Sequence, residues 1–259
     1  MNLGLKNKNV FITGASKGIG FEIAKQLALE GCRIHLVARD KKKLKLSIQN
    51  LRGKKALHSY TSVDLVKKGG PKKAVSEAIK NMGSIDIVIH NLGGGLGKSN
   101  VLSKIDDWNK VLRFNAGIAI ELNNLIVPKM QKSKWGRIVH VSSLNAVTGG
   151  TSSKGGAFAP EYSCAKSYLN MYTKVLGREL AKDNIIVSAV MPGVILTKGK
   201  YWEKLKKTKP KLVKSYIKNH QSVERLGDPS EIAPFVLLLC SDKASYAASS
   251  IISIDGGYF

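Results

Sequence analysis

Short apolar runs alternate along this chain with longer stretches in which apolar residues recur at helical spacing. Apolar runs of this kind are typical of strands buried in a parallel sheet, and amphipathic stretches between them are typical of helices that cover such a sheet. The alternation predicts a doubly wound α/β fold, in which a central parallel seven-stranded sheet carries helices on both faces. The predicted strands cover residues 10–13, 33–38, 56–60, 85–90, 137–141, 185–190 and 251–254, and the predicted helices cover residues 19–30, 71–82, 104–129, 160–181 and 230–240.

One stretch interrupts this alternation. Residues 196–222 are rich in lysine and helical in pattern, and they lie before the last predicted helix and strand. We expect them to form a small helical lobe that is inserted into the fold. Because no linker, internal repeat or low-complexity segment divides the chain, we expect one domain over residues 1–259.

The chain is strongly basic, with 42 Lys and Arg residues, 18 Asp and Glu residues and a formal net charge of +24. Such a charge raises the question of a nucleic-acid or anionic-membrane partner. The lysines are spread over nearly every predicted helix, however, and the dense stretch at 198–218 lacks the regularly spaced aromatic residues of a single-strand groove. We therefore expect no nucleic-acid partner. Attraction of a phosphorylated ligand or an acidic carrier protein by the positive field stays open.

The cysteines and the apolar segments indicate where in the cell the protein is expected to lie. Cys32, Cys164 and Cys240 are widely spaced and include no C-x-x-C pair, which predicts buried or inert thiols and no metal site. Residues 1–8 are polar and basic, unlike a signal peptide. The strongest apolar run, at 232–240, contains a proline and is too short to cross a bilayer, which requires about 20 apolar residues. We expect a cytoplasmic protein without a membrane segment.

A glycine-rich turn follows the first predicted strand and leads directly into the first predicted helix. Residues 13–20 read TGASKGIG, with glycines at positions 14, 18 and 20. Glycines in such a turn let the backbone approach a pyrophosphate, whose charge is favoured by the free N–H groups at the helix N-terminus. The strand before the turn and the helix after it are the context that a dinucleotide-binding motif requires.

Charge beside the expected ribose site indicates which dinucleotide binds. Enzymes that use NAD typically place an acidic residue at the end of the second strand, whereas the 2′-phosphate of NADP needs cations. Ala38 stands where that acid would be, Arg39 follows it, and Lys17 lies within the glycine turn. A guanidinium and an ammonium together form a clamp for a phosphate, which predicts NADP(H) rather than NAD(H). The Asp40 carboxylate would reach the ribose instead if the turn were shifted by one residue.

Tyr162 and Lys166 stand four residues apart at the start of a predicted helix, so their side chains share one face of it. An ammonium beside a phenol favours the phenolate and lowers the tyrosine pKa, which makes the pair a tuned acid or base. Upstream, the predicted strand at 137–141 delivers Ser142 and Ser143 to the carboxyl edge of the sheet, where open α/β sheets bind ligands.

These segments, in this order, resemble the short-chain dehydrogenase/reductase family, and the resemblance covers the entire chain. It extends to RFNAG at 113–117 and MPGVILT at 191–197, whereas HNLG at 90–93 departs from the family's usual NNAG. The resemblance implies a Rossmann-like fold and a role for the lobe in substrate specificity. It implies four catalytic residues, which are Asn115, Ser143, Tyr162 and Lys166. It implies cofactor contacts from Gly14, Ser16, Lys17, Gly18, Ile19, Gly20, Arg39, Asp64, Asn91, Gly93, Tyr162, Lys166, Pro192, Gly193, Ile195 and Thr197.

The same resemblance implies an NADP(H)-dependent oxidoreductase that reduces a ketone to a secondary alcohol or runs in reverse. The pattern is most similar to the 3-oxoacyl-acyl-carrier-protein reductases, which favours a 3-oxoacyl-thioester-like substrate. A keto-sugar or nucleotide-sugar is the alternative, since the segments 144–161 and 198–218 are long. A non-catalytic NADP-binding regulatory protein is an alternative of another class, against which the intact catalytic set argues. Family members pair through the helices near Asn115 and Tyr162 and through the last strand, which implies a homodimer or homotetramer.

Overall fold

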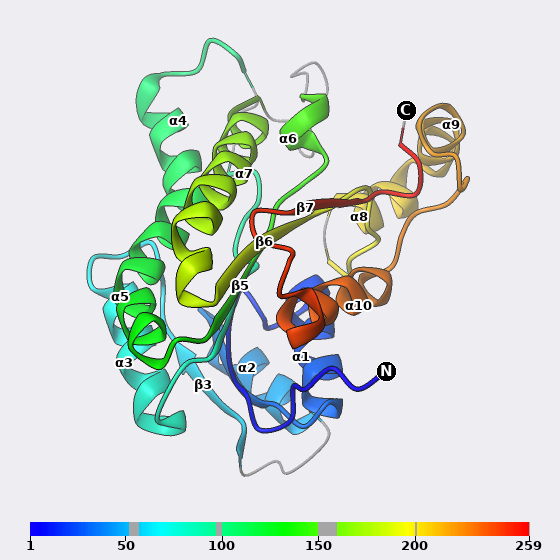
Figure 1. Ribbon diagram of the computed structural model, residues 1–259. Helices are drawn as coiled ribbons and strands as arrows, with labels where there is room; N and C mark the ends of the chain where they lie inside the picture. The colour runs from blue at the N-terminus through cyan, green and yellow to red at the C-terminus, as the bar shows by residue number, and fades with distance from the viewer. Residues whose placement is uncertain (52–56, 97–99, 150–159, 200, 259) are drawn as a thin grey trace.

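A parallel sheet forms the centre of the protein in a computed structural model, which describes residues 1–51, 57–96, 100–149, 160–199 and 201–258 (Figure 1). Its strands are β1 (Asn9–Thr13), β2 (Arg33–Ala38), β3 (Ser59–Ser62), β4 (Ile87–His90), β5 (Gly136–Val141), β6 (Ile185–Pro192) and β7 (Ile251–Ile254). They pair in the order β3-β2-β1-β4-β5-β6-β7, and every neighbouring pair is parallel. The chain therefore winds outward in both directions from β1 and β4, and the switch between these two strands marks the place where such sheets bind ligands.

Helices cover both faces of this sheet. They are α1 (Gly18–Leu29), α2 (Lys41–Gln49), α3 (Gly70–Met82), α4 (Ile105–Leu112), α5 (Ile118–Ser133), α6 (Asn145–Thr148), α7 (Pro160–Leu180), α8 (Tyr201–Thr208), α9 (Pro210–His220) and α10 (Pro229–Cys240). Helices α1, α2 and α10 lie on one side, α3, α5 and α7 lie on the other, and α8 and α9 form the lobe (Figure 1). The predicted fold class is confirmed. Within the described ranges, none of these helices combines the length and the apolar character needed to cross a membrane.

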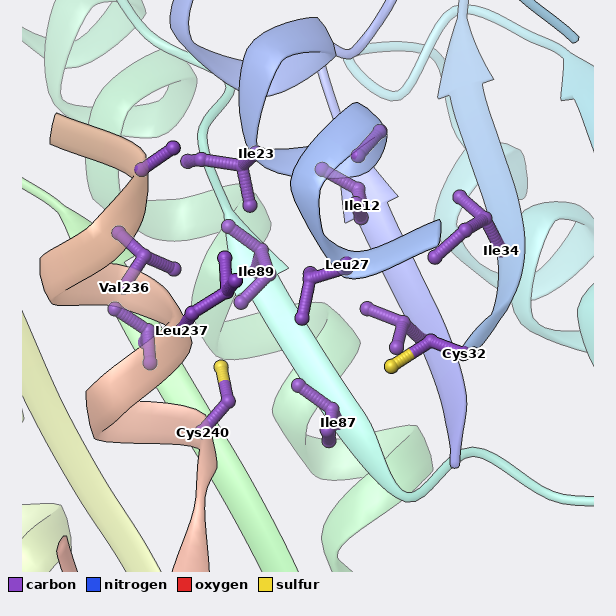
Figure 2. Close-up of a cluster of buried hydrophobic side chains, with 14 of the residues drawn as sticks. Ile12, Ile23, Leu27, Cys32, Ile34, Ile87, Ile89, Val236, Leu237 and Cys240 are labelled. Atoms are coloured by element: carbon purple, nitrogen blue, oxygen red, sulfur yellow. The ribbon is translucent and has the colours of Figure 1, made fainter. Parts of the chain in front are cut away.

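The core beneath α1 and α10 shows why the central strands are mostly apolar. Ile12 of β1 and Ile89 of β4 are fully buried, and they belong to one cluster with Leu27 of α1 and Val236 of α10 (Figure 2). Every position of β1, β4, β5 and β6 is buried. Both faces of a parallel sheet are covered, so the strands carry continuous apolar runs rather than alternating ones.

The cysteines differ in burial. Cys32 and Cys240 lie within the same core, where burial raises the pKa of the Cys32 thiol to about 12 and raises that of Cys240 as well. Cys164, on α7, is exposed. The prediction of buried or inert thiols is therefore confirmed for Cys32 and Cys240 by their burial, and for Cys164 it stays a prediction of an inert thiol.

The main differences from the sequence-based prediction concern β3, α2 and the helix predicted over 104–129. Strand β3 begins at Ser59, and position 56, the predicted start, lies outside the described residues. Helix α2 occupies a lysine-rich stretch for which the pattern predicts no helix, because Leu44 is its single buried apolar residue. The single helix predicted over 104–129 is divided into α4, a π-helical turn at Arg113–Gly117, and α5.

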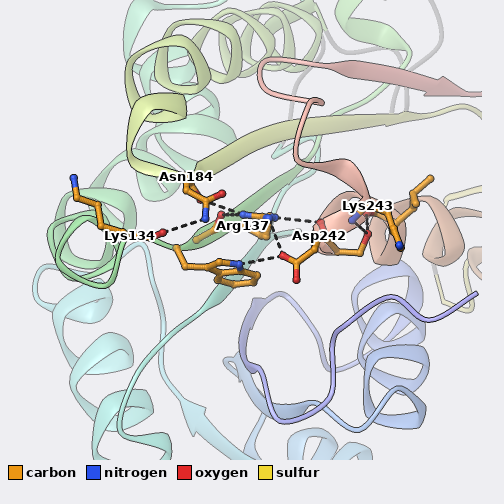
Figure 3. Close-up of polar contacts among 9 residues, drawn as sticks. Lys134, Arg137, Asn184, Asp242 and Lys243 are labelled. Carbon is orange, nitrogen blue, oxygen red and sulfur yellow. Dashed lines mark hydrogen bonds and ion pairs between the residues drawn. The ribbon is translucent and has the colours of Figure 1, made fainter.

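A buried arginine ties the amino end of β5 to the segment after α10 (Figure 3). Arg137 is only 1% exposed, and its guanidinium donates hydrogen bonds to three backbone carbonyl oxygens, among them those of Asn184 at 3.1 Å and Ser241 at 3.3 Å. It also pairs with Asp242 Oδ1 at 3.1 Å, and it lies 4.5 Å from the centroid of the Trp135 ring. These contacts join three segments that are far apart in the sequence.

Replacement of Arg137 by methionine is expected to lower the free energy of unfolding by about 2–4 kcal/mol, because three carbonyl groups and the Asp242 carboxylate each lose one hydrogen-bond donor. Arg178→Met, at an exposed position of α7, is the matched control and should change that energy by less than about 0.5 kcal/mol. Urea unfolding followed by circular dichroism measures both variants. Equal stability of the two would show that the buried arginine is dispensable.

Candidate active site

A cleft of about 730 Å³ opens at the carboxyl ends of the strands. Its wall combines the glycine turn after β1, the loops after β2, β4, β5 and β6, the start of α7, and residues of the α8–α9 lobe. Most of the residues predicted to act or bind meet here, although they come from segments far apart in the chain. Those that line the cleft are Gly14, Ser16, Lys17, Gly18, Ile19, Arg39, Asp64, Asn91, Gly93, Ser143, Tyr162, Lys166, Pro192, Gly193, Ile195 and Thr197.

The glycine turn is packed so closely that side chains cannot replace its hydrogens. Gly18 has φ +64°, and a Cβ there would lie 2.6 Å from Thr197 Cγ2. A Cβ on Gly20 would lie 2.3 Å from Asn91 Nδ2. Gly20 itself does not line the cleft. It allows the Asn91 amide to donate hydrogen bonds to the carbonyl oxygens of Thr13 and Gly14, at 3.0 and 3.1 Å, and so to hold the turn.

The N-terminus of α1 faces this cleft through Gly18 and Ile19. Its N-cap residue, Lys17, makes no side-chain cap hydrogen bond, so no cap side chain occupies the first N–H groups of the helix. Such N–H groups, together with the helix dipole, favour a phosphate. The turn therefore fits the pyrophosphate of a dinucleotide.

Two cations, Arg39 and Lys43, line the end of the cleft beside β2, and Lys17 lines the cleft from the glycine turn, with its Nζ beside Gly199. Asp40 lies among them as the N-cap of α2: its carboxylate accepts a hydrogen bond from the Lys43 N–H at 3.0 Å and pairs with Lys43 Nζ at 2.7 Å. The hydrogen bonds to Lys43 hold the pKa of the Asp40 carboxyl below its usual value. Since capping and the ion pair with Lys43 engage the Asp40 carboxylate, Arg39 is left to face a 2′-phosphate at this end.

Lys43 is a cleft residue that the sequence interpretation missed. It occupies the third position of α2, one turn beyond Asp40. An aspartate followed by helix-forming residues is an N-cap signal, and this signal could have predicted both the helix and the placement of Lys43.

The first turns of α7 bring Tyr162 and Lys166 to the cleft, and the end of β5 brings Ser143. The Tyr162 hydroxyl is hydrogen-bonded to the Ser143 side chain. Lys166 Nζ donates a hydrogen bond to the carbonyl oxygen of Val141 at 2.7 Å and lies 5.7 Å from the centroid of the Tyr162 ring. A phenol, an alcohol and an amine therefore lie together on one wall, within reach of a small polar group.

Burial sets the ionisation of this group in a way that differs from the sequence-based prediction. It raises the pKa of Tyr162, and the hydrogen bond to Ser143, rather than Lys166, opposes that rise. It lowers the pKa of Lys166 to about 7, because a charge is costly in this buried position. The lysine is thus charged for only part of the time near neutral pH, so it cannot act on the phenol as a permanent cation.

Asn115 does not face the cleft, although the sequence predicts a catalytic role for it. It is 2% exposed and lies within the π-helical turn between α4 and α5. Its amide donates hydrogen bonds to the carbonyl oxygens of Val111 at 2.9 Å and Gly94 at 3.0 Å, and its Oδ1 accepts one from the Gly94 N–H at 2.9 Å. Asn115 therefore positions the loop after β4. π-Helical turns are frequent at functional sites, where they redirect a side chain.

Gly93 joins this loop to the catalytic wall. A Cβ at this position would lie 2.7 Å from Asn115 Oδ1 and 2.9 Å from Lys166 Nζ. The absence of a side chain lets the loop lie directly against both groups. Any larger residue would displace the Lys166 ammonium or the Asn115 amide.

His90, at the end of β4, has a structural role. Its Nε2 and the Asn123 Oδ1 of α5 are 2.8 Å apart, and its ring stacks on that of His140 in β5 with centroids 5.0 Å apart. Both imidazoles are buried, which lowers the pKa of His90 to about 4 and keeps it neutral. His90 thus ties β4 to α5 and lies outside the cleft.

The lobe adds aromatic residues to the cleft that the sequence interpretation did not single out. They are Tyr201 and Trp202 of α8, Tyr216 of α9, and Tyr258 after β7. Residues 150–159, within the long segment that the sequence associates with specificity, lie outside the described residues. Across the described ranges, no three His, Cys, Asp or Glu side chains are grouped so that they could hold a metal ion.

Comparisons with known proteins agree with this geometry. Residues 8–207 match the model of the family described as short chain dehydrogenase. The chain is 30% identical to the 3-oxoacyl-[acyl-carrier-protein] reductase FabG of Aquifex aeolicus, over 100% of both chains. It is 30% identical to human dehydrogenase/reductase SDR family member 4, over 98% of this chain and 88% of that protein. The structure of L-sorbose reductase from Gluconobacter frateurii, complexed with NADPH and L-sorbose, superposes with a TM-score of 0.88 at 31% identity, over 99% of this chain and 98% of that one.

Proposed function

The chain belongs to the short-chain dehydrogenase family, and from that premise we propose that it is an NADP(H)-dependent reductase that converts a ketone into a secondary alcohol or catalyses the reverse oxidation. One observation carries the proposal. The hydrogen-bonded Tyr162 and Ser143 line the same cleft as the glycine turn with its cations Lys17 and Arg39. The similarity to an L-sorbose reductase that binds NADPH supports the same coenzyme here.

The coenzyme supplies the hydride that reaches the carbonyl carbon. The residues of the chain bind and orient it: the N-terminus of α1 holds the pyrophosphate, and Lys17 and Arg39 hold the 2′-phosphate. Asp64, Pro192 and Thr197 complete the walls around it. Their part is alignment, since reaction requires the two carbon atoms to be held close in a fixed orientation.

Tyr162 transfers its hydroxyl proton to the substrate oxygen as that oxygen gains negative charge. The Ser143 hydroxyl donates a hydrogen bond to the same oxygen and stabilises the developing charge. The protonated form of Lys166 stabilises the phenolate that Tyr162 becomes, until solvent returns a proton to it. In the oxidative direction Tyr162 begins as the base and accepts the proton of the alcohol.

The substrate is proposed as a ketone. Similarity to the Aquifex aeolicus protein supports a 3-oxoacyl-thioester-like compound, and similarity to L-sorbose reductase supports a keto-sugar. Steady-state oxidation of NADPH with 3-oxoacyl thioesters and keto-sugars tests the proposal. Oxidation with at least one carbonyl compound is expected. Binding of NADPH without oxidation by any of them would instead support a non-catalytic NADP-binding regulatory protein.

Arg39→Leu is expected to weaken NADPH binding about 10- to 100-fold, because a charged hydrogen-bond pair with the 2′-phosphate contributes about 1.5–3 kcal/mol. The Kd of NADH, which lacks that phosphate, should change by less than about twofold. Fluorescence titration of the reduced coenzymes measures both, with Arg178→Leu as the control at an exposed site of α7. Equal weakening of NADPH and NADH would place Arg39 away from the phosphate.

Assembly into a homodimer or homotetramer is part of the proposal. Helix α7 exposes Tyr168, Met171 and Val175, which are 49%, 61% and 58% exposed, and α10 exposes Phe235 and Leu238. Large apolar side chains gathered on helix surfaces are typical of faces that bind another protein. Light scattering on the purified chain should give a mass of two or four subunits, and the mass of one subunit would contradict the assembly.

A further inference from the structure

The lobe wall of the cleft is aromatic. Tyr201 and Trp202 come from α8, Tyr216 comes from α9, and Tyr258 comes from the end of the chain. Their rings form a continuous series: the centroids of Tyr201 and Trp202 are 5.4 Å apart with the rings edge to face, and those of Trp202 and Tyr216 are 4.9 Å apart. The hydroxyl oxygens of Tyr216 and Tyr258 are 3.0 Å apart, within hydrogen-bonding distance. Four rings from three segments thus line one wall.

Backbone hydrogen bonds hold the last of these rings in place. Residues 255–258, here called the C-terminal strap, follow β7 and run beside the end of α9 (Figure 1). The N–H groups of Ser222 and Val223 donate to the carbonyl oxygens of Gly257 and Gly256, at 3.0 and 3.1 Å. Gly256 and Gly257 have φ of +69° and +70°, a conformation that other residues rarely adopt. The strap is therefore built to bring Tyr258 to the cleft.

A small apolar core around Trp202 supports this wall from behind. Trp202 is 8% exposed and forms a small core with Val194 and Val213, beneath Tyr216 and Tyr258. Because this core is independent of the two main cores of the sheet, the wall can differ from that of related proteins without disturbing the fold. Such separation is expected of a segment that determines specificity.

The lysines of the lobe lie outside this wall. Those that the structure describes are exposed, and none of them lines the cleft; they are Lys198, Lys204, Lys206, Lys207, Lys209, Lys211, Lys214 and Lys218. The cations that do line it are Lys17, Arg39 and Lys43 at the coenzyme end and Lys166 on the catalytic wall. A phosphate or carboxylate on the substrate would therefore meet no counter-charge from the described part of the lobe. The high positive charge of the lobe does not select the substrate.

We propose that Tyr216 and Tyr258 determine substrate specificity, and that the substrate is an uncharged ring ketone that carries hydroxyl groups. This inference rests on the proposed ketone reduction. The C–H faces of such a ring pack against the aromatic rings, and its hydroxyl groups form hydrogen bonds with the phenol hydroxyls, since an aromatic residue of this kind has an apolar body and a polar tip. The pair does not take part in proton transfer, which stays with Tyr162.

The experiment compares four substrates with the intact enzyme and NADPH: a polyhydroxylated cyclohexanone, cyclohexanone itself, a keto-sugar phosphate and a 3-oxobutanoyl thioester. The wild type is expected to prefer the polyhydroxylated ring, with kcat/KM at least about tenfold above that for the phosphate and the thioester. Tyr258→Phe and Tyr216→Phe should each lower kcat/KM for this ring about five- to tenfold, mainly through KM, because each loses a hydrogen bond. With cyclohexanone the same variants should differ from the wild type by less than about twofold.

Tyr246→Phe is the matched control, because Tyr246 is fully exposed and does not line the cleft. Its kinetics should equal those of the wild type with every substrate. Preference of the wild type for the phosphate or the thioester would overturn the inference, and so would equal losses by the two tyrosine variants with both rings. In either case ketone reduction itself would stand. Failure of the wild type to reduce any of the four compounds would refute the proposed function first.

Discussion

Tyr162→Phe is expected to lower kcat for ketone reduction by about 1000-fold or more, because the substrate oxygen loses its proton donor as negative charge develops on it. Phenylalanine keeps the ring and its packing on α7, so the fold and the cleft should not change. The Kd of NADPH should stay within about twofold of the wild-type value, since its charges are held by Lys17, Arg39 and the N-terminus of α1. Stopped-flow absorbance of NADPH measures the chemical step, and coenzyme fluorescence measures binding.

Tyr246→Phe is the matched control for this result. Tyr246 loses the same hydroxyl, but its side chain is fully exposed and lies outside the cleft. Its kcat should equal that of the wild type. Retention of more than a tenth of the activity by Tyr162→Phe would remove Tyr162 as the proton donor, and loss of NADPH binding would point to a collapsed site instead.

Reduction should slow as the pH rises above about 7, and the slowing should reach about 100-fold by pH 9, because each pH unit lowers the charged fraction of the buried lysine about tenfold. Burial lowers the pKa of Lys166 from 10.5 to about 7. The ammonium that stabilises the Tyr162 phenolate is therefore present below pH 7 and lost above it. The pKa of Tyr162 is raised by burial, so its own proton stays in place over this range. The dependence of kcat on pH between 6 and 9 measures this effect.

Lys166→Arg provides the comparison for the pH profile. A guanidinium stays charged at every pH used, so the variant should have a lower rate than the wild type but a flat profile from pH 6 to 9. A flat profile in the wild type would show that the lysine keeps its proton when the site is in use. The same fall in both proteins would assign the titration to another group.

Much of the fold was predictable from the sequence because buried strands and helix faces require apolar residues at regular local spacing. Strands β1 and β2 and helix α1 match their predicted extents to within a residue, since every position of β1 is buried and α1 follows directly on the glycine turn. Helix α2 shows no such apolar spacing. Its stability comes from the Asp40 cap and a few contacts, and lysines occupy most of its exposed surface. The π-helical turn was equally hidden, because one extra residue in a helix does not alter its apolar pattern visibly.

The candidate site divides in the same way. Tyr162, Lys166 and Ser143 could be found because spacing and strand ends are local properties. The inward placement of Asn115 depends on the loop at Gly94, 21 residues away in the chain, and could not be read from its neighbours. The aromatic wall joins α8, α9 and the C-terminal strap through contacts such as that between Tyr216 and Tyr258, which are 42 residues apart. Contacts over such separations need the folded structure.

Transfer of deuterium in a single turnover tests most directly whether one cleft brings the hydride donor and Tyr162 to the same carbonyl group. The wild-type enzyme is mixed with a ketone and NADPH labelled at one of the two C4 positions of the nicotinamide, and the alcohol is analysed by mass spectrometry. We expect deuterium on the carbinol carbon from only one of the two labelled coenzymes. In the time that the wild type needs for one turnover, Tyr162→Phe should give at most a trace of labelled alcohol, although it binds the coenzyme. Unlabelled product from both coenzymes, or no alcohol from the wild type when it is saturated with NADPH, would contradict this arrangement.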